Sequence, residues 1–317
     1  QVDPTNVKAA ESLSVIYREG NQGSKLASVL EVILNASSVI LGSDQDLGSI
    51  EEARTSIIEL AELYEVSLRK PQQAFDWIAR LLTIAPDTQD AWDTLIRLAG
   101  AVRPPLFADA ISLLMTARQE AAGLLDPEQE RDLCLELSRV ARQELQDLSQ
   151  ALQLSQEALG LDPSSIKALR QLESLYEEQG SWERVVTSLS ELAELTFDEE
   201  KESVLFKLGD VYRDHLGLFD QSIDAYNTLL AFNPTRRDAV EALHMLYRQQ
   251  NDPNALFNVI HQEIDLIKSE IAEGEEGIHT ATLGLELELA MLEIEELDKL
   301  ESAIERLQGV LDRHQAH

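Results

Sequence analysis

The stretch from Gln150 to Val186 reads QALQLSQEALGLDPSSIKALRQLESLYEEQGSWERVV, and it decides the fold. Its apolar residues recur at helical spacing on both sides of a single Asp-Pro step. Proline is accepted in the first turn of a helix but breaks a helix interior, so the step at Pro163 separates two helices. The stretch alone leaves open whether these helices form one hairpin of a globular domain or belong to a repeat.

The helix that ends near Pro163 has two further copies in the chain. Gln72 to Pro86, Ser149 to Pro163 and Asp220 to Pro234 align without gaps, and their final prolines lie 77 and 71 residues apart. A second helical pattern precedes each copy in the same register. A related but distinct pattern follows each copy, before the next pair of helices begins. We therefore expect about eight helical hairpins of two alternating types, with a period of roughly 35 to 40 residues.

Local signals agree with helices throughout the chain. Ser49 and Asp126 are each followed by Glu or Gln at the spacing of a capping box, so we expect helices to begin there. The leucines from Leu283 to Leu289 alternate, which by itself favours a strand. We nevertheless expect a helix, because Leu, Glu, Ala and Met are strong helix formers and the repeat requires a hairpin there. The predicted fold is therefore all-α.

Around Gly180 and Trp182 the pattern becomes specific enough to compare with a known family. The chain resembles the tetratricopeptide repeat family, whose consensus sets a leucine, a tyrosine, a turn glycine, an aromatic residue and a final proline at fixed spacing. The matching residues are Leu172, Tyr176, Gly180, Trp182, Val185, Leu189 and Leu192, then Leu208, Gly209, Tyr212, Tyr226, Leu229 and Pro234, and finally Leu60, Ala61, Tyr64, Ala74 and Pro86. The hairpins that end in proline depart from the consensus by one extra residue in the turn between their helices.

The resemblance implies a right-handed α-solenoid of about eight helix-turn-helix repeats. Each hairpin exposes too much apolar surface to stand alone, and stacking its neighbours on it closes a continuous core. We expect residues 1–317 to form a single solenoid, with an N-terminal repeat over 1–35, central repeats over 49–272 and a C-terminal repeat over 278–317. Because the sequence begins QVDPTN without methionine, we also expect a processed chain or a piece of a longer one.

The composition narrows the choice of partner. The 58 acidic residues outnumber the 26 basic ones, which gives a net charge of −32 and argues against nucleic acid or an anionic membrane surface as a partner. The apolar run SSVILG near Val39 is far shorter than the roughly 20 residues that span a bilayer. A single cysteine, Cys134, excludes an intramolecular disulfide. We expect a soluble protein without direct membrane insertion, with the cytoplasm slightly favoured and the compartment otherwise open.

The residues that could carry chemistry form no catalytic or cofactor motif. Phosphate-binding, zinc-protease, nucleophile-elbow and dinucleotide signatures are missing from the sequence. His314 and His317 at the chain end, and the alternate acids from Asp44, are weak metal patterns. Cys134 falls on a packed helix face, where a buried, inert thiol is expected. We predict no enzyme activity, no cofactor and no metal site. The aromatic side chains are expected to pack in the core. Trp92, which is flanked by acids, is the one for which a ligand-stacking role is the strongest alternative.

In the tetratricopeptide family the first helix of each hairpin lines the concave groove. Projected onto this sequence, that rule puts a notable share of the basic residues on the groove side, namely Arg139, Arg142, Lys167, Arg170, Arg213 and Arg248. A locally positive groove would suit an acidic peptide or a carboxylate. The alternative is that these cations pair with neighbouring acids such as Glu173 and Glu177 and only balance charge. The family's lysine and asparagine clamp for a C-terminal carboxylate has no counterpart that we can place here.

These observations predict a non-enzymatic scaffold that binds a protein or peptide partner through the concave groove or the acidic outer faces, notably over residues 270–305. The alternative is a structural subunit that self-associates through the ends of the solenoid into a larger assembly. Both follow from the same property, because a stacked helical array offers long surfaces and two ends.

Overall fold

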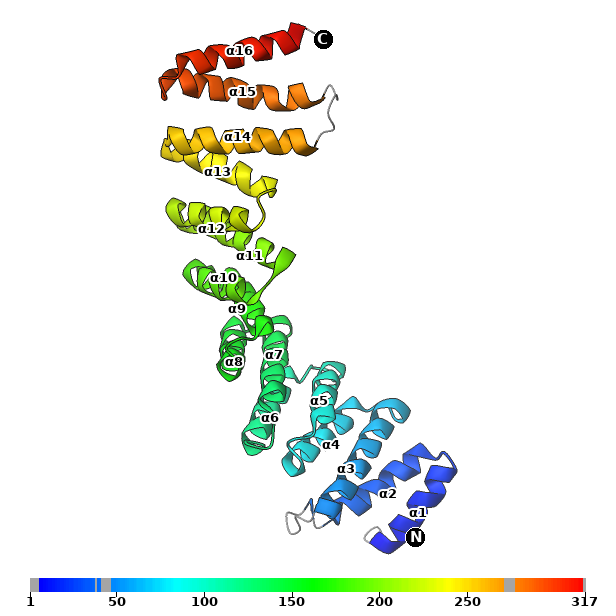
Figure 1. Cartoon of the computed structure of the whole chain (residues 1–317). Coiled ribbons are helices and arrows are strands. Elements are labelled where there is room, and N and C mark those ends of the chain that lie inside the picture. The colour runs from blue at the N-terminus through cyan, green and yellow to red at the C-terminus, as the bar shows by residue number, and fades with distance from the viewer. Residues whose placement is uncertain (1–5, 38, 41–46, 271–276, 316–317) are drawn as a thin grey trace. The chain divides into compact units, whose positions relative to one another are not determined.

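The computed structural model describes residues 6–37, 39–40, 47–270 and 277–315 of the chain (Figure 1). Within these ranges all regular structure is helical, with sixteen α-helices and two short π-helical turns. In the same part of the chain, no helix combines the length and the apolar character that crossing a bilayer requires. The chain divides into two compact units, Gln1–Ala168 and Leu169–His317, with the boundary inside one helix.

In the described part of the first unit, the helices pair in chain order into four hairpins. These are α1 (Val7–Glu19) with α2 (Gly23–Asn35), α3 (Leu47–Glu62) with α4 (Pro71–Ile84), α5 (Gln89–Ala101) with α6 (Phe107–Glu120), and α7 (Pro127–Gln143) with α8 (Leu148–Leu161). The π-helical turn η1 (Leu63–Ser67) extends α3. The unit boundary lies in the next helix, α9 (Ile166–Gln179).

The described part of the second unit continues the same scheme with the remaining hairpins. These are α9 with α10 (Trp182–Leu195), α11 (Asp198–Val211) with α12 (Phe219–Phe232), α13 (Arg237–Gln250) with α14 (Pro253–Glu270), and α15 (Gly277–Glu295) with α16 (Leu300–Gln315). The π-helical turn η2 (Tyr212–Leu216) extends α11. The all-α array of tetratricopeptide-like hairpins that the sequence predicts is therefore confirmed, whereas one uninterrupted solenoid over 1–317 stays a prediction.

The turns inside the hairpins account for the two alternating types. In one type the turn closes on a backbone bond across five residues, as from Ser181 N–H to the Tyr176 carbonyl at 2.9 Å. In the other type it closes across six, as from Lys70 N–H to the Tyr64 carbonyl and from Leu218 N–H to the Tyr212 carbonyl, both at 2.8 to 2.9 Å. The extra turn residue expected from the sequence is thus absorbed as a widened helical turn, which in η1 and η2 is a π-helix.

Most of the predicted helix ends are correct. Helices α4, α8 and α12 end at Ile84, Leu161 and Phe232, each two residues before one of the aligned prolines. Asp126 begins α7 with a complete capping box, in which the Gln129 side chain accepts from the Asp126 backbone N–H at 3.1 Å. The prediction that Ser49 begins a helix is wrong, because α3 already starts at Leu47. The segment with alternating leucines is helical, as expected, and forms part of α15.

Small residues let the two helices of a hairpin approach closely. Ser138 of α7 donates from Oγ to the Ala151 carbonyl of α8 at 2.7 Å, inside a fully buried contact. Ser222 of α12 makes the corresponding bond to the Gly209 carbonyl of α11 at 2.8 Å. Tyr226 lies flat against Gly209 and is fully buried, so the glycine leaves the space that the aromatic ring fills.

Replacing Gly209 by Ala should destabilise the protein. A Cβ at this position would lie 2.5 Å from the Tyr226 ring, and the ring cannot withdraw, because its hydroxyl bonds to Asp210 at 2.7 Å. Overpacking of this kind costs about 1–3 kcal/mol of unfolding free energy, which urea denaturation followed by circular dichroism measures. Gly284→Ala, where nothing lies within 4 Å of the new Cβ, should instead be neutral or stabilising. Equal effects of the two substitutions would contradict the packing account.

Candidate functional site

Ion pairs connect successive first helices within the first unit. Arg18 of α1 reaches Glu59 of α3 at 2.6 Å, and Arg97 of α5 pairs with Glu65 of η1. These contacts use side chains on the first helix of each hairpin, which is the face that the family resemblance assigns to the groove. Arg18 and Arg97 are therefore engaged by carboxylates of the neighbouring hairpin.

The second unit has the same kind of ladder along its first helices. The pairs are Arg170 of α9 with Glu200 of α11 at 3.1 Å, Lys207 of α11 with Glu173 and Glu177 of α9 at 2.7 Å, Arg236 before α13 with Glu202 of α11 at 3.3 Å, and Arg248 of α13 with Glu288 of α15. His244 also contacts Glu288, and its bond to Glu263 raises the pKa of its imidazole. Cations on this face again bridge neighbouring hairpins.

The six basic residues predicted to line the groove lie on α7, α9, η2 and α13. In the first unit, Arg139 holds Glu136 at 2.9 Å and Gln143 at 2.7 Å, and Lys167 is exposed with its Nζ 3.9 Å from Asp132. Arg142 is half-buried on the same helix as Arg139. In this unit the structure therefore brings Arg139 and Lys167 to carboxylates of one helix, α7.

In the second unit the predicted residues lie apart from one another on three first helices. Arg170 pairs with Glu173 at 3.2 Å as well as with Glu200, Arg248 pairs with Glu288, and Arg213 holds Asp214 and Asp210, each at 2.7 Å. The bond to Asp214 raises the pKa of the Arg213 guanidinium above its ordinary value. Binding of an acidic partner by these six residues stays a prediction, and such a partner would compete with the carboxylates that already hold Arg139, Arg170, Arg213 and Arg248.

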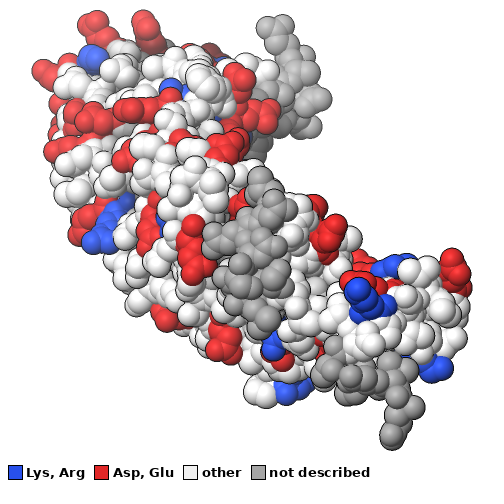
Figure 2. All heavy atoms as spheres, turned by 90° about the horizontal axis from the view of Figure 1, so that it is seen from below, with Lys and Arg blue, Asp and Glu red and all other residues white. Residues whose placement is uncertain are grey.

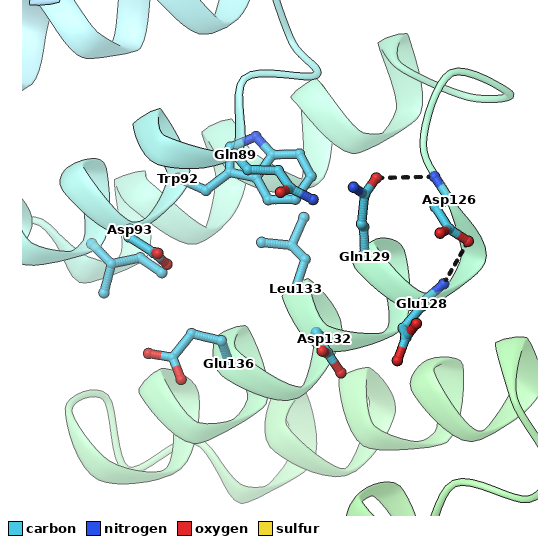
Figure 3. Close-up of a pocket in the computed structure, with 10 residues that line it drawn as sticks. Gln89, Trp92, Asp93, Asp126, Glu128, Gln129, Asp132, Leu133 and Glu136 are labelled. Carbon is cyan, nitrogen blue, oxygen red and sulfur yellow. Dashed lines mark hydrogen bonds between the residues drawn. The ribbon is translucent and has the colours of Figure 1, made fainter.

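An open pocket of about 570 Å³ lies between α5 and α7, where the first helices of two hairpins face each other (Figure 3). Its lining residues come from α5, from the start of α7 and from the cap before α7. They are Gln89, Trp92, Asp93, Ile96, Asp126, Glu128, Gln129, Asp132, Leu133 and Glu136. The pocket lies wholly within the first unit.

The floor of the pocket is apolar and fixed. Trp92, Ile96 and Leu133 contribute it, and each is less than one-tenth exposed. The Trp92 indole donates from Nε1 to the Pro86 carbonyl at 3.1 Å, which sets the orientation of the ring. Figure 3 shows Trp92 of α5 and Leu133 of α7 pointing toward one another across the pocket. Because these groups are held by packing, the floor is preformed for a ligand.

Carboxylates surround this floor, and the lining includes neither lysine nor arginine. Figure 3 shows Asp93 and Glu136 at one end of the pocket and the capping-box residues Asp126 and Gln129 at the other. Behind the lining, Arg131 pairs with Asp132 at 2.9 Å and with Glu128 at 3.2 Å, and Arg139 pairs with Glu136. Asp93 is exposed and makes no side-chain hydrogen bond or ion pair within the described residues. The site keeps an excess of negative charge.

The sequence carried one signal for this pocket, namely Trp92 with acidic neighbours. It did not reveal the facing residues, because Asp132 and Glu136 lie on another helix and approach α5 only through the stacking of hairpins. Figure 2 shows one face of the molecule, over which carboxylates are spread and on which lysine and arginine are fewer. Because the sequence has 58 acidic residues, the five that line this pocket could not be distinguished from the others by sequence alone.

Among the other candidate residues, only Cys134 has a side chain that the structure describes. No group of three His, Cys, Asp or Glu side chains in the described ranges is arranged to hold a metal ion. Asp44 and His317, named above as weak metal patterns, lie outside the described residues, as does the side chain of His314. Cys134 is fully buried with Leu135, Ala158 and Ala168.

These features define the chain as an all-α helical-repeat protein built from tetratricopeptide-like hairpins. No family model matches it, and comparison with curated proteins gives no match. Similar solved structures include MamA, with 16% identity and a TM-score of 0.39 over 62% of this chain and 96% of that one. Another is YrrB, described as a TPR protein with an unusual peptide-binding site, with 17% identity and a TM-score of 0.37 over 63% of this chain and 98% of that one. Because these scores are low, the assignment rests on the hairpins themselves.

The Cys134 thiol should resist modification in the folded protein. Burial raises its pKa to about 11, so the reactive thiolate is scarce at neutral pH, and the side chain has no exposed surface. We expect alkylation by iodoacetamide at pH ~8 to be at least about a hundredfold slower than in urea, as measured by mass spectrometry. Rapid native labelling would show that the α7–α8 contact opens readily.

Proposed function

We propose that this chain is a non-enzymatic protein-interaction scaffold that holds a segment of a partner protein in the α5–α7 pocket. The observation that supports it best is the pocket itself, a preformed apolar floor surrounded by charged side chains on the exposed face of two stacked hairpins. A cavity of about 570 Å³ falls within the usual size of ligand pockets, roughly 300–1,000 Å³.

The lining favours binding over catalysis. It supplies carboxylates, two amides and apolar groups, and no serine, cysteine, histidine or lysine stands beside the carboxylates to form a nucleophile–base pair with them. Its walls belong to two separate hairpins, so a bound segment would also contact the junction between them. An extended or helical peptide fits such a junction better than a small substrate that must be enclosed.

Affinity capture with a blocked pocket tests this function. Gln89 lies exposed at the pocket and makes no side-chain bond in the described structure, so Gln89→Trp should fill the cavity without disturbing the hairpin. We expect the tagged wild-type chain to retain a partner from the lysate of its source organism, and the Gln89→Trp variant to lose most of it. Quantitative mass spectrometry of the captured proteins measures the difference.

Two further variants make the capture decisive. Gln119→Trp adds the same ring on the exposed side of α6, away from the pocket, and should retain the partner. Charge reversal at Arg139, Arg142 and Arg170 tests the groove residues predicted from the sequence, with circular dichroism as the check on folding. Capture that survives Gln89→Trp but is lost on charge reversal would contradict the pocket and move the site to those arginines.

A second candidate function is self-association through the ends of the array. The observation that favours it is an apolar stripe on α16, where Leu300, Ile304 and Leu311 are 56%, 46% and 55% exposed and share one helix face. On α1, Val15 and Ile16 are also more than half exposed. Interior hairpins cover such residues with the next hairpin, so these faces are suited to contact with a further helical hairpin, which in self-association a second copy supplies.

Light scattering at increasing protein concentration tests this alternative. If α16 carries the contact, the weight-average mass should rise with concentration, and Ile304→Glu with Leu311→Glu should return it to that of the monomer. Met245→Glu provides a control, because Met245 of α13 is also highly exposed but lies on a different helix. A mass that stays monomeric at every concentration would rule the alternative out.

A further inference from the structure

The pockets along the first helices differ in one respect, which is the presence of a cation. The pocket shared by α1, α3 and α5 contains Arg18 and Arg97, each paired with a glutamate of the neighbouring hairpin. The pocket beside α13 and α15 contains Arg248, paired with Glu288. The α5–α7 pocket has five carboxylates in its lining and no cation. At this junction the chain does not supply the positive charge that it supplies at the other two.

The cations nearest to the α5–α7 pocket do not fill this place. Arg131 is largely buried behind the lining and also holds Asp162, which follows α8 directly, at 2.9 Å, so it is committed to its own hairpin. Arg139 lies on the exposed side of α7, where it pairs with Glu136 three residues before it. Asp93 of α5 is left without a partner in the described structure. A positive group that entered between α5 and α7 would therefore meet at least one unpaired carboxylate.

The floor of the pocket favours an organic cation over a metal ion. Trp92 contributes an indole ring fixed by its bond to the Pro86 carbonyl, and a cation over such a ring is stabilised by the ring quadrupole. The chain uses this contact itself, since the Arg80 guanidinium lies 4.6 Å from the centre of the Trp77 ring. Within the described residues, no three ligating side chains are arranged to hold a metal. A guanidinium can contact the part of the ring that reaches the pocket and bond carboxylates beside it at the same time.

We propose that the segment bound in the α5–α7 pocket carries an arginine, whose guanidinium lies against Trp92, pairs with Asp93 and shares Glu136 with Arg139. This inference rests on the proposed scaffold function and names its partner class, a basic peptide segment of another protein. The partner's arginine supplies the positive charge that Arg97 and Arg248 supply at their junctions. The pocket volume leaves room for the residues on either side of that arginine.

The test uses the full chain and synthetic peptide pools that are random except for one central position, fixed as arginine, citrulline or glutamate. Citrulline has the shape of arginine without its charge. Binding is followed by the indole N–H signal of Trp92 in NMR spectra, assigned with the Trp77→Phe and Trp182→Phe variants. We expect the arginine pool to shift this signal and to bind about tenfold more tightly than the citrulline pool, because a charge-assisted pair is lost.

Substitutions in the pocket should reproduce that difference from the protein side. Asp93→Asn with Glu136→Gln should weaken binding of the arginine pool about tenfold and leave the citrulline pool unchanged. Asp109→Asn with Glu120→Gln removes the same charge from exposed positions on α6 and should change neither pool. Both double variants keep the size of the side chains, so unfolding of the pocket would appear equally with both peptide pools.

The results separate this inference from the function on which it rests. Equal binding of the arginine and citrulline pools, or binding of the glutamate pool alone, would overturn the arginine proposal and keep the pocket as a peptide site. If no pool shifts the Trp92 signal but the Gln89→Trp variant loses its captured partner, the arginine proposal is overturned and the scaffold function is kept. No shift with any pool and full capture by Gln89→Trp would overturn both.

Discussion

The close contact between the two helices of each hairpin is the constraint on which the rest of the structure depends. The aligned positions Ala74, Ala151 and Ser222 are all fully buried, and each begins the face of a second helix that packs on its first helix. At Gly209 even a methyl group would collide with Tyr226. Helices that approach so closely cannot place large residues between their axes. Larger apolar residues therefore point to neighbouring hairpins, and stacking follows from that arrangement.

Stacking in turn determines what the exposed side of the first helices can do. Once both apolar faces of a hairpin are covered, the remaining positions on its first helix are polar, and they face the corresponding positions of the next hairpin. In a chain with 58 acidic and 26 basic residues, these junctions have too few cations to pair every carboxylate. Arg18, Arg97 and Arg248 each serve one junction. Between α5 and α7 every charged residue of the lining is acidic, and the junction opens as a pocket over Trp92.

The fold could be predicted well from the sequence because it depends on local signals that recur along the chain. Prolines two residues beyond α4, α8 and α12, the capping box at Asp126 and the extra turn residue each depend on neighbours in the chain. The failure at Ser49 has the same origin, since a capping box does not show whether the helix begins upstream of it. The site was harder to predict. Arg170 and Glu173 are visible as a pair three residues apart, whereas Glu200 joins them only through stacking.

The sign of the partner's charge follows from this distinction. The sequence shows which arginines lie on the first helices but not which carboxylates they pair with. It therefore predicts a positive groove surface that suits an acidic peptide. In the folded chain Arg139, Arg170, Arg213 and Arg248 already hold carboxylates, and an acidic partner would have to displace one of them at each position. A basic partner at the α5–α7 pocket displaces nothing at Asp93 and adds a contact with Trp92. In a molecule this acidic, an incoming cation therefore gains more at an unpaired carboxylate than an incoming anion gains at a paired arginine.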